Sequence, residues 1–174
     1  MIRLKCNDEI VFRTINDLFK QKKLIYSSDS NDNYTTISIN LTNQKLCVDI
    51  NGKTVNFSFP INLNNFLSKV SNQLYDVKMS VGQFYYYPYQ RIISSMEKKS
   101  LLTDIQNIIL SNLLISNNGI NKHVLYQLIW SKDKNISLNK LDTHLTNLKN
   151  QLKNDLDANV VFQSNDKILR LFIN

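Results

Sequence analysis

The chain has 174 residues, of which 43% are hydrophobic, so it can bury the core of one domain or of two small ones. Its 21 Lys and Arg residues against 14 Asp and Glu residues give a formal net charge of +7, which suits a polyanionic partner or an anionic membrane surface. No apolar run is long enough to span a membrane and the first residues do not resemble a signal peptide, so we expect a cytoplasmic protein without a membrane partner.

The chain begins with a segment that predicts a helix and then a strand. A helix is expected over residues 9–23, where four apolar residues share one face: Ile10, Ile15, Leu18 and Phe19. After a polar loop over 27–33, polar and apolar residues alternate over 34–41, which is typical of a strand. We expect this strand to be exposed and available to a partner.

Two further strands and a helix complete a small α+β module over residues 1–79. The strands are expected over 45–50 and 53–59, because Asn51-Gly52 between them is a strong hairpin dipeptide. Pro60 ends the sheet, and apolar residues at helical spacing follow from Leu63 to Tyr75. The expected role of this module is dimerisation or partner binding.

The second module, residues 80–174, begins with aromatic strands and continues as helices. Strands are expected over 84–89 and 91–96. Thr103 can cap the helix that follows, and Gly119 can end it as a left-handed cap. Asn121 then starts a second helix.

The third helix of this module has two different sides. Ser137 can cap it, and its leucines recur in steps of three and four, on one side: Leu138, Leu141, Leu145, Leu148 and Leu152. The opposite side carries side chains that can form hydrogen bonds and almost no acidic residues: Asn139, Lys140, Thr143, Asn147, Asn150 and Asn154. Between residues 132 and 153, five lysines face only two aspartates. This pattern favours a helix that lies in the groove of a polyanion.

Two closing strands, over 160–163 and 168–173, are expected to pair across residues 164–167. Three helices closed by a terminal hairpin are typical of a winged helix-turn-helix. The predicted fold class is therefore α+β, with a winged helix-turn-helix over 80–174 preceded by a small α+β domain over 1–79.

The second module resembles the DNA-binding domain of OmpR/PhoB-type response regulators. Leu102-Thr103 precedes the first helix, and Gln106 stands where the family usually has an acid. Trp130 closes the second helix, and the run LDTHLTNLKNQL over 141–152 is similar to the family's recognition helix. Arg170-Leu171 fits the closing hairpin. The resemblance implies a transcription regulator with double-stranded DNA as its partner, whose third helix enters the major groove while the hairpin serves as the wing.

The same resemblance implies roles for individual residues of the third helix. Positions that contact the DNA backbone in the family are occupied here by Asn139, Lys140, His144 and Lys149. Positions that can reach base edges are occupied by Thr143 and Asn147, and Asn150 shares the outward side. Lys149 lies nearer the leucine side, so its head would have to extend outward to reach a phosphate.

Two departures from the family change the expected specificity and affinity. The family usually has Arg at the position of Asn147, and because Asn can pair with adenine in a bidentate manner, we expect a preference for A·T-rich sites. The wing has lost the family's Arg-Gly-x-Gly-Tyr pattern, and Asp166 at its tip would repel phosphate. Monomer affinity should be modest and sensitive to salt, so we expect a homodimer.

Residues 1–79 are too few for the receiver domain that such regulators carry. Asn7-Asp8-Glu9 is faintly similar to the receiver's acidic pair, and Asp49 ends a strand as a phosphoacceptor does. No Lys-Pro pair follows, and the Asn51-Gly52 hairpin makes the Asp49 strand antiparallel, whereas receiver strands are parallel. We therefore expect no phosphoacceptor and a regulator that acts independently of phosphorylation.

No motif in the sequence predicts catalysis, a metal site or a cofactor. His123 and His144 lie on different predicted helices, Cys6 and Cys47 form no CxxC pair, and three glycines cannot form a phosphate-binding loop. We expect no enzyme activity. The alternative to a DNA-binding regulator is a protein-interaction adaptor built on a winged helix. RNA polymerase is a further candidate partner of a regulator.

Overall fold

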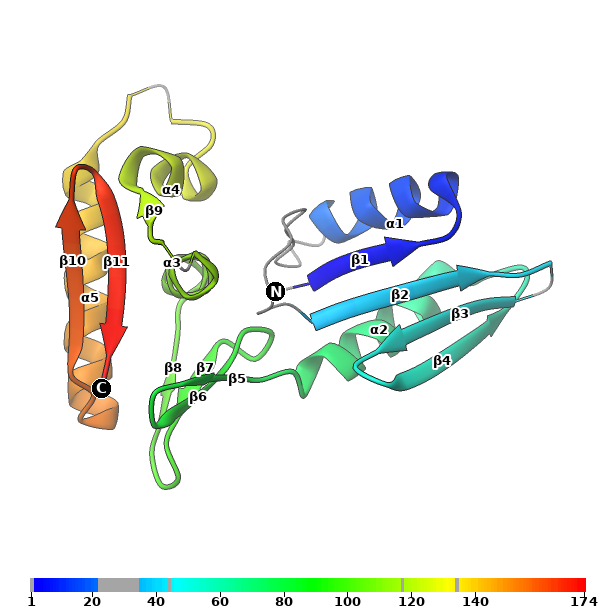
Figure 1. Ribbon diagram of the computed structural model, residues 1–174, viewed down its shortest axis with the longest axis horizontal. Helices are drawn as coiled ribbons and strands as arrows, with labels where there is room; N and C mark the ends of the chain where they lie inside the picture. The colour runs from blue at the N-terminus through cyan, green and yellow to red at the C-terminus, as the bar shows by residue number, and fades with distance from the viewer. Residues whose placement is uncertain (1, 22–34, 44, 117, 134) are drawn as a thin grey trace. The chain divides into compact units, whose positions relative to one another are not determined.

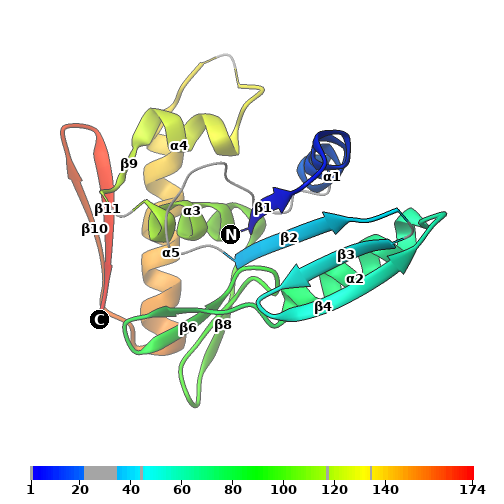
Figure 2. The same ribbon diagram turned by 45° about the vertical axis from the view of Figure 1, so that its right-hand side comes forward.

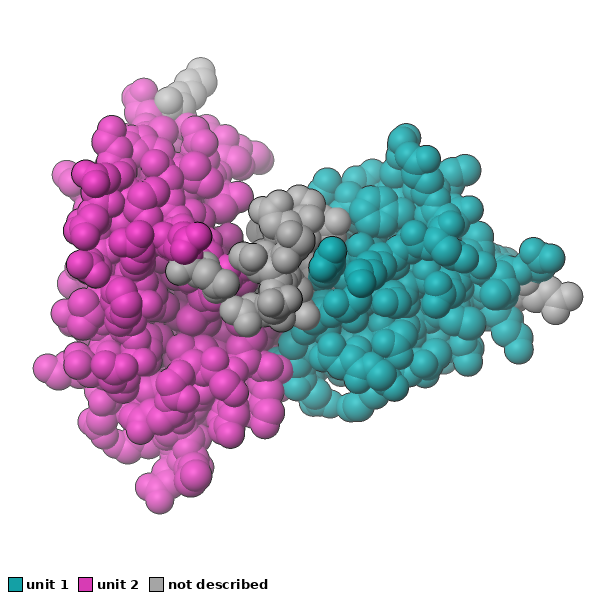
Figure 3. All heavy atoms as spheres, viewed as in Figure 1, with its two compact units in different colours: residues 1–77 teal, residues 78–174 magenta. Residues whose placement is uncertain are grey.

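The computed structural model describes residues 2–21, 35–43, 45–116, 118–133 and 135–174. Within them the chain forms five helices and eleven strands in three small sheets, a mixed α+β structure (Figures 1 and 2). Two compact units divide the chain, residues 1–77 and residues 78–174 (Figure 3). The predicted loop over 27–33 and the last two residues of the predicted helix over 9–23 lie outside the described residues.

Unit 1 (residues 1–77) contains one four-stranded sheet. Its strands are β1 (Ile2–Cys6), β2 (Thr35–Leu41), β3 (Lys45–Ile50) and β4 (Lys53–Ser58), and they lie side by side in that order. β1 runs parallel to β2, and the other pairs are antiparallel. The prediction that β2 is an exposed strand is wrong, because β1, which the sequence did not predict, pairs with the edge that β3 leaves open.

The helices α1 (Glu9–Gln21) and α2 (Leu63–Tyr75) cover one face of this sheet. Phe19 of α1 and Leu74 of α2 are fully buried, and they belong to a core that the inward residues of the strands complete: Leu4, Ile37, Ile39, Leu46, Val48, Ile50 and Phe57. The opposite sheet face is polar, as the alternation along β2 predicts. This unit is therefore a sheet with helices on one side only.

Asn7, Asp8 and Asp49, which are faintly similar to the acidic pair and the phosphoacceptor of a receiver domain, stabilise local structure in unit 1. The Asn7 side chain continues the β1–β2 pairing, since its Nδ2 donates to the Leu41 carbonyl at 3.0 Å and its Oδ1 accepts from the Leu41 N–H at 2.7 Å. Asp8 caps α1 by accepting from the Val11 N–H. Asp49 accepts from the Gly52 N–H and the Thr54 hydroxyl, so it stabilises the hairpin turn.

Unit 2 (residues 78–174) begins with a four-stranded antiparallel sheet. Its strands, in spatial order, are β5 (Met79–Val81), β6 (Phe84–Tyr87), β7 (Ile92–Ser94) and β8 (Lys99–Leu101). The sequence predicted the strands corresponding to β6 and β7 but neither β5 nor β8. Phe84 and Tyr86 are buried while Tyr85 between them is exposed.

Three helices follow: α3 (Asp104–Ile115), α4 (Lys122–Ile129) and α5 (Leu138–Leu156). Thr103 caps α3 as predicted, and its capping box is completed by the Gln106 side chain, which accepts from the Thr103 N–H at 2.8 Å. Asn121, where a helix was predicted to start, is the N-cap of α4. Ser137 stands at the start of α5 but makes no capping hydrogen bond, contrary to the prediction.

The chain ends in a hairpin of β10 (Val160–Asn165) and β11 (Ile168–Ile173), and the two-residue strand β9 (Ile120–Asn121) pairs with β11. The turn is tighter than predicted. It consists of Asp166 and Lys167, whose φ values of 49° and 66° are the left-handed values that a two-residue hairpin turn needs.

Gly119 does not cap α3, which ends at Ile115 with Ser116 as its C-cap. Its φ is +83°, and a Cβ atom there would lie 2.7 Å from the Leu169 carbonyl oxygen of β11. Glycine is therefore required because the backbone passes close to the hairpin.

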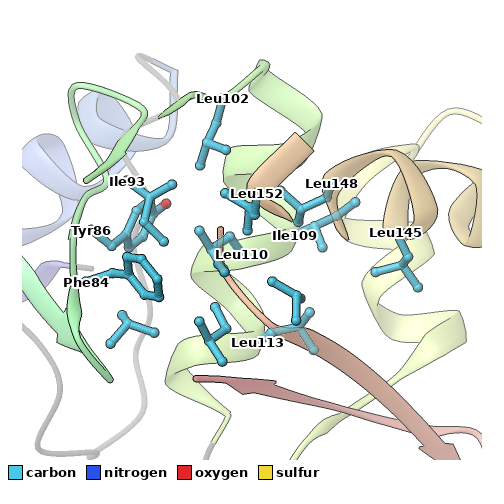
Figure 4. Packing of buried hydrophobic residues seen from close by; sticks show 14 of the residues in the cluster. Phe84, Tyr86, Ile93, Leu102, Ile109, Leu110, Leu113, Leu145, Leu148 and Leu152 are labelled. Atoms are coloured by element: carbon cyan, nitrogen blue, oxygen red, sulfur yellow. The ribbon is translucent and has the colours of Figure 1, made fainter. Parts of the chain in front are cut away.

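The core of unit 2 joins the first sheet, α3, α5 and the hairpin (Figure 4). Within it lies a buried polar network. The Tyr86 hydroxyl lies 2.6 Å from Asn107 Oδ1 and 2.5 Å from Ser111 Oγ, and Asn107 Nδ2 donates to the Pro88 carbonyl. Burial raises the pKa of the Tyr86 phenol well above its ordinary value. The network fixes α3 against β6.

Candidate nucleic-acid interface

The inner side of α5 consists of leucines, as the spacing predicts. Leu141, Leu148 and Leu152 are 0% exposed, and Leu145, at 5%, is also buried. Leu156 extends this row to the last turn of the helix. Five buried leucines on one side fix the rotation of the helix, because turning it would expose them to water.

The outer side of α5 is exposed and rich in amides and hydroxyls. The exposed residues there are Asn139, Thr143, Thr146, Asn147, Asn150 and Asn154. The hydroxyls of Thr143 and Thr146 donate to helix carbonyls four residues back, which leaves their oxygen lone pairs and methyl groups outward. These residues are uncharged, and the nearby acid Asp142, whose side chain is 50% exposed, is paired with Lys122. Thr146, which the sequence did not indicate, belongs to the same surface.

Towards α4, the flank of α5 is tied to the connection between the two helices. Lys140 Nζ lies 3.1 Å from Asp133 Oδ2 and 4.3 Å from the centre of the Trp130 ring. The Tyr126 hydroxyl donates to the same carboxylate at 2.8 Å, and this bond, followed by the one from Lys140, lowers the pKa of Asp133. The ring of His144 lies 5.4 Å from that of Trp130. Lys140 and His144 thus help to hold the turn between the helices.

Towards the hairpin, α5 borders a groove of about 350 Å³. Lys149 and Thr146 line it from α5, Phe162 and Ser164 from β10, and Lys122 from the start of α4. Lys149 is exposed, so its head reaches the surface as expected from its place beside the leucines. Lys122 Nζ pairs with Asp142 Oδ1 at 2.7 Å, which leaves Lys149 as the cation of the groove without a described ion pair.

The C-terminal half of α5 is anchored by a second polar network that the sequence did not predict. Gln151 Nε2 donates to Ser100 Oγ at 2.8 Å and to the Leu101 carbonyl at 2.9 Å. Gln106 Nε2 donates to Gln151 Oε1 at 2.8 Å, and Ser100 donates to Asp155 Oδ2 at 2.6 Å. The Gln106 amide uses both of its ends, since its Oε1 accepts from the Thr103 N–H and its Nε2 donates to Gln151. The network joins α5 to β8 and to the cap of α3.

Of the predicted site residues, Asn139, Thr143, Asn147 and Asn150 therefore share one exposed surface. Lys149 lies on the flank beside the hairpin, and Lys140 and His144 lie on the opposite flank beside Trp130. Nothing in the sequence indicated Lys122, which reaches the groove because the start of α4 lies close to the hairpin.

Across the described ranges, no three His, Cys, Asp or Glu side chains lie close enough together to hold a metal ion. None of the helices in these ranges combines the length and the apolar character needed to cross a membrane. Cys6 and Cys47 are both free and half-buried.

Comparison with known protein families and with curated proteins finds nothing that matches this chain.

Proposed function

We propose that unit 2 is a winged helix-turn-helix that binds double-stranded DNA, and that the protein is a sequence-specific transcription regulator of the OmpR/PhoB type that acts without phosphorylation. The observation that carries this proposal is the outer side of α5. Its amide and hydroxyl side chains are exposed together, and the leucines behind them keep them outward. Such groups supply the donors and acceptors that read base edges.

The order of elements around α5 supports the proposal. α4 and α5 form the helix pair, α3 supports them, and the β10–β11 hairpin lies beside α5 as a wing would. The Asp133–Lys140 ion pair and the Trp130 ring fix the connection between α4 and α5. A recognition helix must be held in this way, because its side chains have to meet the groove at a defined angle.

Thr143 and Asn147 are proposed to face the bases. They lie four residues apart on one exposed side, so both can enter the same groove. An asparagine amide pairs with the N6 and N7 atoms of adenine, and a threonine methyl group can contact thymine. α5 contains no arginine, the side chain that most often reads guanine. The preferred site should therefore be rich in A·T pairs.

Contacts with phosphate are proposed from Asn139 and Asn150 on the outer side of α5, and from Lys140, His144 and Lys149 on its flanks. Lys149 has no described ion pair, whereas Lys140 must give up or share Asp133 before it can contact DNA. Few free cations predict modest affinity and a small negative slope of log affinity against log salt concentration.

The test is a fluorescence-anisotropy titration of the full chain with a duplex selected from a random pool, at low and moderate salt. We expect binding that weakens with salt, and an A·T-rich selected site. Asn147→Ala should relax the base preference, while Asn56→Ala, which removes an exposed asparagine of β4 in unit 1, should leave it unchanged. An unchanged site for Asn147→Ala, or G·C-rich selected sites, would contradict this role of α5.

The alternative is a protein-interaction adaptor. It is favoured by Val124 and Leu128, which are 50% and 54% exposed on one side of α4, and by the acidic Asp166 at the hairpin turn. An adaptor would show no binding to duplex DNA at either salt concentration. In a regulator, the same side of α4 is available to a protein partner, for which RNA polymerase is a candidate.

A further inference from the structure

One face of unit 1 exposes apolar side chains that its own core does not use. Ile10, in the first turn of α1, is 78% exposed. Phe59, which follows β4, is 50% exposed, and Leu63, at the start of α2, is 51% exposed. All three border the same groove, so they form one patch and not scattered surface residues.

The groove between these residues has a volume of about 190 Å³. Apart from Thr14 its lining is apolar, and besides the three exposed residues it includes Leu18, Leu46 and Phe66. The Thr14 hydroxyl already donates to the Ile10 carbonyl at 2.9 Å. The groove therefore offers almost nothing to orient a polar small molecule, which sites for such ligands normally require.

We propose that this α1–α2 face pairs with the same face of a second copy of the chain around a two-fold axis. A two-fold interface uses one surface twice, so that surface must carry both a projection and a hollow that receives it. Ile10 projects at the rim of the groove, and the groove is large enough for an aliphatic side chain. The face meets both requirements by itself.

The available area agrees with a dimer. The exposed parts of Ile10, Phe59 and Leu63 amount to roughly 400 Å², which is the size of the largest apolar patch on a typical monomer. With the groove lining included, two copies would bury on the order of 1,000 Å², the lower limit for a specific interface. The expected dimer is therefore reversible.

The charges beside the patch also permit two copies to meet. Glu9 and Arg13, on the turns that carry Ile10, form an ion pair at 2.5 Å while their side chains are 75% and 74% exposed. Because the pair is neutral overall, identical faces do not bring like net charges together. Two copies joined here would also carry two α5 helices, so that DNA half-sites could be bound together. The pairing itself depends only on unit 1.

The experiment is sedimentation velocity of the full chain, without DNA and with a reductant for the two free cysteines, from about 1 to 100 µM. The apparent mass should rise with concentration from 20.3 kDa towards twice that value. Ile10→Asp and Leu63→Asp should each raise the dimer dissociation constant at least tenfold. Val124→Asp, which places the same charge on an exposed apolar position of unit 2, should leave the constant unchanged.

Circular dichroism checks that each variant is folded. We expect both aspartate variants to fold, because the side chains of Ile10 and Leu63 are largely exposed. If the chain stays monomeric at every concentration, the inference is wrong, and a different protein would be the partner of this face. An equal effect of Val124→Asp overturns it as well. A dimer that shows no salt-dependent DNA binding would contradict the proposed function alone, and a monomer that binds duplex would contradict the dimer alone.

Discussion

Replacing Tyr86 with phenylalanine tests whether the buried network of unit 2 contributes to its stability. The ring is 0% exposed, so Phe keeps the packing and removes only the hydroxyl. Ser111 still donates to the Asn107 carbonyl and Asn107 Nδ2 still donates to the Pro88 carbonyl. Asn107 Oδ1 alone loses its described partner and stays buried, which costs about 1–3 kcal/mol.

For a unit of this size, each kcal/mol lost from the free energy of unfolding lowers the melting temperature by about 4–8 °C. The assay is urea unfolding followed by the fluorescence of Trp130, the only tryptophan of the chain, which reports on unit 2. Tyr85→Phe is the matched control, because Tyr85 is 40% exposed on the same strand and should change stability by less than about 0.5 kcal/mol. If Tyr86→Phe is as stable as the control, the hydroxyl does not satisfy Asn107 in solution.

Three further results are expected. Gly119→Ala should destabilise unit 2 by more than about 1 kcal/mol, because the added Cβ would clash with β11. Gly52→Ala should cost less, because Gly52, although its φ is +82°, has open space around it. Chemical unfolding of both variants measures the difference. Leu148→Ala should cost about 2–5 kcal/mol by leaving a cavity, and the adjacent Asn147→Ala less than about 0.5 kcal/mol; equal losses in thermal unfolding would mean that α5 is not held by its leucines. Since burial in the folded state raises the pKa of Tyr86, the unfolding free energy should fall as the pH rises above about 10. Tyr86→Phe should make that fall less steep. An unchanged slope would mean that Tyr86 does not have a raised pKa in the folded state.

The residues of α5 show how far local pattern decides structure. The spacing of its leucines alone predicts which side is buried, because a helix places residues three and four apart on one face. The exposed amides on the other side follow from the same periodicity. The Thr103 and Asn121 caps were also predictable, since a cap depends on only a few neighbouring residues.

The sequence did not predict, or predicted wrongly, the features that join segments distant along the chain. The residues that pair between β1 and β2 are 33 positions apart, as Ile2 and Thr35 are, and nothing local to Thr35–Leu41 shows that its second edge is covered. Gly119 was expected to cap a helix, but its conformation is set by β11 passing close to it. Long-range pairing depends on which segments meet, and a single sequence carries no periodicity that reports it.

The α+β class, the five described helices and the two sides of α5 could be read from the sequence alone, because they follow from local backbone geometry and from the burial of apolar side chains. The folded structure was needed to show that Lys140 faces Asp133 and Trp130, that Gln151 connects α5 to β8 and α3, and that Lys122 and Lys149 meet beside the hairpin. These partners could not be predicted, because the partner of an ion pair or hydrogen bond depends on distance in space, which the packing of whole elements sets.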